Sequence, residues 1–133
     1  MNKRTKLNAF YAYYKNTPFS WEDNNCAGFA SQVVKQLHGI DFSEVDHLIN
    51  GKSKFQILYN LRKRNQYISD IITDKLGQPI DPKLAKPGDI VVEGEGYEEN
   101  VGICYDVGWS YFQKENGLMR VLNKYCSSAW RCK

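Results

Sequence analysis

Histidine is scarce in this sequence: among 133 residues there are two, His38 and His47. Imidazole supplies most general bases and many metal ligands near neutral pH, so this scarcity restricts both kinds of chemistry. The four cysteines include no Cys-x-x-C pair, which leaves little support for a structural zinc site. We expect neither a metal ion nor a cofactor.

Long apolar runs are also missing. None approaches the roughly 20 residues that span a bilayer, and the first residues lead into a polar and aromatic stretch instead of the apolar core of a secretion signal. We therefore expect no membrane insertion, no signal peptide and, with the cytoplasm as the default compartment, no disulfide bonds. A length of 133 residues predicts one domain, residues 1–133, because two halves would each lack a sufficient core.

The net charge is small, +3 from 18 basic and 15 acidic side chains, but it is unevenly distributed. Residues 1–66 carry a net charge of +5 and residues 67–133 a net charge of −2. Nucleic-acid binding is one interpretation of the basic half. Solvated helix faces are the favoured one, because no recognisable nucleic-acid module surrounds these charges. The basic residues form two runs: Lys3, Arg4, Lys6 and Lys15, then Lys52, Lys54, Arg62, Lys63 and Arg64.

Apolar side chains at helical spacing predict four helices in the first half of the chain. These predicted helices occupy residues 2–15, 25–39, 53–65 and 68–76. Asn24 or Asn25 is suited to cap the second helix and Ser53 the third, because their side-chain oxygens can accept from free N–H groups. Gly39 and Gly77 are suited to end helices.

Short β-branched and aromatic runs predict four strands in the second half. They occupy residues 89–92, 101–105, 109–113 and 118–122. The links at 106–108 and 115–117 contain hairpin signals, the second a type I′ turn at Asn116-Gly117. Helices followed by strands are the α+β pattern, so we predict N-terminal helices packed on one side of a C-terminal antiparallel sheet.

Cys26 is the candidate nucleophile. It stands at the first position of a predicted helix, where free backbone N–H groups and the helix dipole stabilise a thiolate. A buried thiol between helix and sheet is the alternative interpretation. His38 lies on the same helix twelve residues further on, roughly 18 Å away at the rise of an α-helix, and is out of reach as a base. His47 follows Gly39, in a segment where contact with Cys26 is open but not required.

Four glutamates lie within residues 93–99. This acidic stretch lacks the register of an EF-hand loop, and a solvated loop kept extended by charge repulsion is the favoured interpretation. Contact with a basic surface is the other, including the protein's own basic face in a neighbouring copy.

Several motifs in the same order resemble a known pattern. They are Phe19-Ser20-Trp21, Asn25-Cys26-Ala27-Gly28-Phe29-Ala30, His38-Gly39-Ile40-Asp41, Lys86-Pro87-Gly88-Asp89-Ile90-Val91-Val92, Val101-Gly102-Ile103-Cys104, Gly117-Leu118 and Ala129-Trp130-Arg131. Together they are similar to a small phage-encoded family of unassigned function related to the NlpC-type, papain-like cysteine peptidases. The resemblance runs nearly end to end.

The resemblance implies an NlpC-like fold in which Cys26 opens a helix packed on an antiparallel sheet. In active NlpC-like enzymes a histidine directly precedes the Val-Gly-Ile segment and acts as the base, and here Asn100 stands at that position. An amide cannot take up a proton at neutral pH. The acidic residue that commonly precedes the cysteine is replaced by Asn25. These departures favour a fold kept without its activity.

The resemblance implies a phage virion structural or tail-assembly protein, in the tail tip or baseplate region, that acts through protein–protein contacts. Its expected partners are other phage structural proteins or further copies of itself, and its expected location is the virion, after synthesis in the bacterial cytoplasm. The alternative is an active cysteine endopeptidase or amidase that cleaves peptidoglycan peptides with Cys26 as nucleophile and His47 as an unconventional base. A third hypothesis is an interaction module that binds a host factor.

Overall fold

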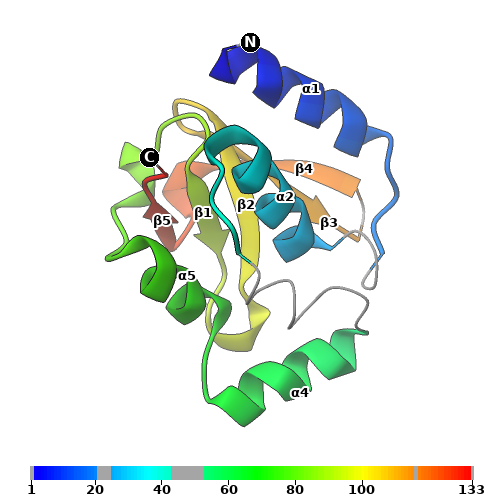
Figure 1. Cartoon of the computed structure of the whole chain (residues 1–133), viewed down its shortest axis with the longest axis vertical. Helices are drawn as coiled ribbons and strands as arrows, with labels where there is room; N and C mark the ends of the chain where they lie inside the picture. Colours follow the sequence, from blue (N-terminus) through cyan, green and yellow to red (C-terminus); the bar gives the residue numbers. More distant parts are fainter. Residues whose placement is uncertain (1, 21–24, 43–52, 116, 133) are drawn as a thin grey trace.

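The computed structural model describes residues 2–20, 25–42, 53–115 and 117–132. Within these residues the chain is α+β, with four α-helices followed by one five-stranded antiparallel sheet (Figure 1). The helices are α1 (Lys3–Lys15), α2 (Cys26–His38), α4 (Lys54–Arg64) and α5 (Ile68–Leu76). The strands are β1 (Ile90–Glu93), β2 (Asn100–Asp106), β3 (Trp109–Lys114), β4 (Gly117–Leu122) and β5 (Ser128–Trp130). The predicted α+β class is confirmed.

Three helices begin at polar residues that satisfy their first free N–H groups. The side chains of Asn2, Asn25 and Ser53 each accept a hydrogen bond from a backbone N–H in the first turn of α1, α2 and α4. Helix α2 ends at Gly39, whose φ of 69° lies in the left-handed region that glycine adopts without steric cost. These boundaries confirm the helix limits predicted from the sequence.

The sheet has the strand order β4-β3-β2-β1-β5. Strands β1 to β4 form the predicted meander, while Asn116 of the predicted turn lies outside the described residues. Strand β5 was not predicted: it pairs with the free side of β1, with Trp130 opposite Ile90. Three residues are too few to show an alternating pattern, so this strand exists because of its partner and not because of its own sequence.

The two faces of the sheet are covered differently. On one face, the buried apolar residues of all four helices join those of β1 and β2 in one large cluster. That cluster includes Phe29, Val33, Leu61, Ile72, Ile90, Val92, Val101 and Ile103. On the other face a smaller cluster packs under the segments around Ala85 and Cys126. The prediction that the helices cover one side of the sheet is confirmed, and irregular segments protect the other side.

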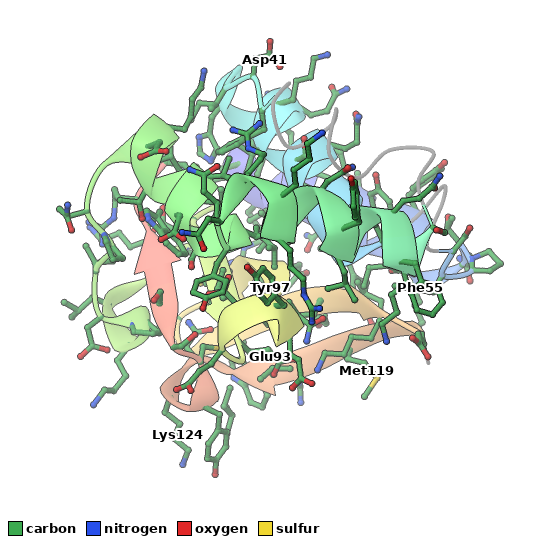
Figure 2. The ribbon with its side chains drawn as sticks, turned by 90° about the horizontal axis from the view of Figure 1, so that it is seen from below. Asp41, Phe55, Glu93, Tyr97, Met119 and Lys124 are labelled. Atoms are coloured by element: carbon green, nitrogen blue, oxygen red, sulfur yellow. The ribbon has the colours of Figure 1, made fainter. Side chains whose placement is uncertain are left out.

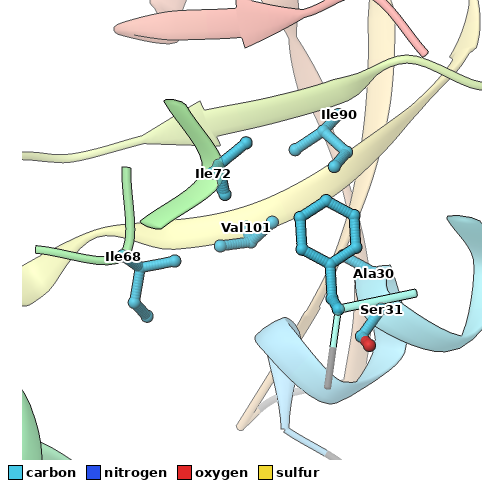
Figure 3. A pocket seen from close by; sticks show the side chains of 7 residues that line it. Ala30, Ser31, Ile68, Ile72, Ile90 and Val101 are labelled. Carbon is cyan, nitrogen blue, oxygen red and sulfur yellow. The ribbon is translucent and has the colours of Figure 1, made fainter. Parts of the chain in front are cut away.

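A small pocket remains between α2, α5 and the sheet, and Figure 3 shows its lining side chains. It is lined by Ala30, Ser31, Phe42, Ile68, Ile72, Ile90 and Val101. Its volume is about 10 Å³, which is room for one water molecule in a mainly apolar surrounding. It is a packing gap and too small to hold a ligand.

Gly102 in β2 marks a place where two strands leave no room for a side chain. A Cβ atom there would lie 2.5 Å from the backbone oxygen of Tyr111 and 2.6 Å from Cδ2 of Phe112. We expect Gly102→Ala to lower the free energy of unfolding by about 3 kcal/mol, because the strands must move apart. Urea denaturation measures this change.

Gly108→Ala is the matched control for that experiment. At Gly108 an added Cβ meets nothing within 4 Å, and only the left-handed backbone, with φ at 81°, opposes it. We expect a cost of about 1 kcal/mol from this strain. Equal losses in the two variants would show that crowding at Gly102 is relieved without cost.

Candidate functional site

The candidate site is built on the N-terminus of α2, which starts at Cys26 as predicted. Asn25 is buried and caps the helix, with Oδ1 accepting from the N–H of Gly28 at 2.8 Å and its carbonyl oxygen accepting from the N–H of Phe29 at 2.9 Å. The helix dipole places partial positive charge at this end, which favours an anionic group. The side chain of Cys26 lies outside what the structure describes.

The two ends of α2 lie at opposite ends of β2, along which the helix packs (Figure 1). At the C-terminal end, Nε2 of His38 donates to the carbonyl oxygen of Gly88 at 3.0 Å, and the N–H of Gly88 donates to Cys104 near the end of β2. Since α2 spans about 18 Å, its N-terminus lies toward the other end of the strand, where β2 begins at Asn100. The fold therefore brings Cys26 and Asn100 to the same end of the sheet.

The candidate bases are placed as follows. His38 is confirmed to be at the far end of α2 from Cys26, where it holds the turn at Gly88. Asn100 is half-buried and pairs with Glu93 across β1 and β2. His47 lies outside the described residues, so its assignment as a base stays a prediction.

Gln113 is a polar residue near this end of the sheet that the sequence analysis did not single out. It follows Phe112, which pairs with Gly102, so it lies close to the start of β2. Its side chain is 0% exposed, and Nε2 donates to the carbonyl oxygen of Thr17 at 3.2 Å. Within the described part of the chain Oε1 has no donor, a condition that costs about 1–3 kcal/mol in a buried amide.

A sequence signal for Gln113 did exist. The period of two in β3 places Gln113 on the same side of the strand as Trp109 and Tyr111, and Tyr111 stacks on Tyr11 of α1. A glutamine on a face covered by a helix must be buried, and buried amides are normally retained for a bond that they make. The alternation of β3 gave the face of Gln113, but the cover over that face, which decides its burial, is known only from the structure.

The remaining cysteines are structural. Cys104, Cys126 and Cys132 are free thiols, and burial raises the pKa of all three, to about 11 for Cys126 and Cys132. The amide of Asn123 donates to the sulfur of Cys104 at 3.6 Å. A thiol whose pKa is raised stays protonated at neutral pH and is a poor nucleophile. Cys104 is fully buried and acts as a small core residue.

The acidic stretch is more ordered than expected. Residues Gly96–Glu98 form a 3-10 helix, so the expectation of an extended loop is wrong. Glu93 forms an ion pair with Lys114, and Glu99 accepts from the N–H of Ser69 at 3.1 Å, while burial raises the pKa of Glu99. Lys114 neutralises one of the four glutamates and so reduces, without removing, the repulsion on which the expectation rested.

Neither a metal centre nor a membrane span is visible in the described ranges. No three histidine, cysteine or acidic residues there lie together as metal ligands would. Among the helices that the structure describes, none is long and apolar enough to cross a bilayer.

A family described as a domain of unknown function (DUF6950) matches residues 1–132, nearly the whole chain. No curated protein matches the sequence.

Proposed function

Since the chain belongs to the DUF6950 family, whose description names no activity, we propose a function from the resemblance of its motifs to the NlpC-like family and from the residues of its candidate site. It is a phage virion structural or tail-assembly protein of the tail tip or baseplate region. It has a degenerate NlpC-like fold and acts through protein–protein contacts with other structural proteins of the particle.

One observation carries this proposal: at the end of the sheet near the N-terminus of α2, the strand β2 begins with an amide side chain and not with a base. An NlpC-like hydrolase needs a base there, and Asn100 starts β2 at that place. His38 is on the same helix as Cys26 but holds Gly88 at the opposite end. An amide orients neighbouring groups but does not take a proton from a thiol. The architecture is compatible with the fold of a peptidase whose chemistry has been lost.

Mass spectrometry of purified particles tests the structural role. The particles are those of the phage or prophage whose genome encodes the chain, separated on a density gradient from free protein. We expect the protein to migrate with intact particles or isolated tails at a constant ratio to a known tail protein. Its absence from both, in a lysate where the free chain is abundant, would contradict the proposal.

The second candidate function is hydrolysis of peptidoglycan peptides with Cys26 as nucleophile, and the capped N-terminus of α2 supports it. Site-resolved alkylation across a pH series separates the two candidates. Under the structural proposal no base assists Cys26, and its alkylation rate keeps rising as the pH passes through neutrality, whereas an activated nucleophile already reacts at its full rate well below neutrality. Cys126 and Cys132, whose pKa values are raised to about 11, are internal references that stay unreactive at neutral pH.

Digestion of purified cell-wall sacculi completes that comparison. We expect no release of peptide fragments by the unchanged protein above the level seen with Cys26→Ala. Fragment release that Cys26→Ala abolishes, together with early alkylation of Cys26, would establish the hydrolase.

A further inference from the structure

One side of α4 points away from the core. Ile57 and Leu61 are buried on the inner side, whereas Phe55 is 84% exposed and Tyr59 64% exposed. Phe55, Tyr59 and Lys63 follow at steps of four residues and therefore form one row along the helix. Beside the row is a shallow hollow, lined by Phe55, Gln56, Tyr59 and Asn60. Large aromatic rings that lie together on one helix and are exposed to water are typical of a contact surface.

The outer face of α4, which we define as Phe55, Tyr59, Arg62 and Lys63, becomes basic toward its C-terminal end. The segment Lys54–Arg64 contains four basic residues and no acidic residue. Such a face on its own would fit many acidic partners, so its surroundings decide which partner fits best.

The acidic loop, residues 93–99, lies directly beside this face. The guanidinium carbon of Arg62 is 5.3 Å from the centre of the Tyr97 ring, and the Tyr97 ring stacks edge-on against Tyr67. Figure 2 shows Tyr97 under α4, with Phe55 at the end of the helix. Within the loop, Glu95 and Glu98 are exposed, while the other two glutamates have partners in the chain.

The basic outer face of α4 and the acidic loop lie side by side, and this arrangement disfavours a partner that carries negative charge alone. A nucleic acid or an anionic membrane would be attracted by Lys63 but repelled by Glu95 and Glu98 a short distance away. A surface that carries both signs next to each other is complementary to itself when a second copy is turned by a two-fold rotation. The outer face of α4 in each copy then meets the acidic loop of the other copy.

We propose that the outer face of α4 and the acidic loop together form a two-fold dimer interface between copies of this chain. Phe55 and Tyr59 pack on the rings around Tyr97 of the other copy, and Lys63 meets Glu98 of the other copy. The contact occurs twice, once in each direction. This inference deepens the proposed function, because it names a surface through which a contact protein associates.

The first test measures the molar mass of the purified full chain by sedimentation over a range of concentrations. We expect a monomer–dimer equilibrium that shifts toward the monomer at high salt, because salt screens the attraction between the outer face of α4 and the acidic loop of the other copy. Tyr59→Ser should weaken the dimer about tenfold or more, as removal of a central ring does in other interfaces. Tyr13→Ser on α1 is the matched control, since Tyr13 is also 64% exposed, and it should leave the dissociation constant unchanged.

Charge reversal gives the second and sharper test. Lys63→Glu and Glu98→Lys should each be monomeric, because every cross-contact then joins like charges. An equimolar mixture of the two variants should form a dimer again, since both contacts in the mixed pair join opposite charges. A third sample, the doubly changed chain, should also dimerise.

Three outcomes overturn the proposal: a monomer at every concentration, association that Tyr59→Ser and Lys63→Glu leave intact, or growth beyond the dimer, which would mean a head-to-tail contact. Circular dichroism of each variant shows that the fold is retained. Because the experiment uses only the purified chain, its failure leaves the particle measurement untouched. A protein that dimerises as expected but is absent from particles would contradict the proposed function alone.

Discussion

Trp130→Ala is expected to lower the free energy of unfolding by about 4 kcal/mol, the loss typical of a fully buried large ring. Trp130 is buried at the junction of β5 and α5, and its indole N–H donates to the hydroxyl of Thr73 at 3.2 Å. Removal of the ring leaves a cavity in the large cluster and takes away the side chain that anchors β5 to the core. Equilibrium urea denaturation followed by far-ultraviolet circular dichroism measures the loss.

Two further substitutions separate the contributions of the hydrogen bond and of ring burial to this loss of unfolding free energy. Trp130→Phe keeps most of the volume but loses the bond to Thr73, so it should cost about 1–2 kcal/mol. Trp109→Ala makes the same deletion at a half-buried ring, which Arg120 covers at 3.9 Å, and should cost about half as much as Trp130→Ala. A Trp130→Ala loss no larger than that of Trp109→Ala would contradict the central position assigned to β5.

Asp89→Ala is expected to cost about 2–3 kcal/mol, because a buried carboxylate with three donors disappears. Its oxygens accept from the N–H of Lys86 at 2.9 Å, from Nε of Arg131 at 3.2 Å and from the N–H of Cys132 at 3.1 Å. Asp89 thus ties the turn before β1 to the segment after β5. We expect a smaller loss of unfolding free energy than for a fully buried ion pair, because the Arg131 side chain is 38% exposed. The thermal midpoint of unfolding records the change.

Asp81→Ala is the control for Asp89. Asp81 is exposed, and its side chain accepts one bond, from the N–H of Lys83, at the start of a short 3-10 helix. A loss of about 1 kcal/mol or less is expected, as for the removal of a single cap. If both substitutions cost the same, the bonds of Asp89 to Arg131 and Cys132 contribute little.

The helices could be predicted almost to the residue, because their signals are local. A polar cap at Asn25 or Ser53 and a glycine at the end act within one helical turn, whatever the rest of the chain does. The first four strands could be predicted for the same reason, since each is a local β-branched or aromatic run and the turns between β2, β3 and β4 are short. Strand β5 could not, because its pairing with β1 joins residues far apart in the sequence and leaves no local pattern.

The candidate site was predictable in position but not in detail. The sequence placed Cys26 at the start of a helix and Asn100 at the start of a strand, and the packing of α2 along β2 brings both to one end of the fold. It did not show that Gln113 is buried near this end, with an oxygen that no donor in the described part of the chain reaches, because burial depends on how α1 and the segment around Thr17 cover β3. It also missed the turn at Gly96–Glu98, since the ion pair of Glu93 with Lys114 and the bond of Glu99 to Ser69 form only after folding.

The place of β5 affects the risk of aggregation. The hairpin connecting β2 to β3 closes over a few residues, but Val92 meets Ser128 across most of the second half of the chain, and such distant closures form late in folding. Until then β1 has an open edge with the apolar sequence Ile-Val-Val, which can pair with the same edge of another molecule. Variants that loosen β5, Trp130→Ala first among them, should therefore form sheet-rich aggregates during refolding at protein concentrations where the unchanged chain stays clear.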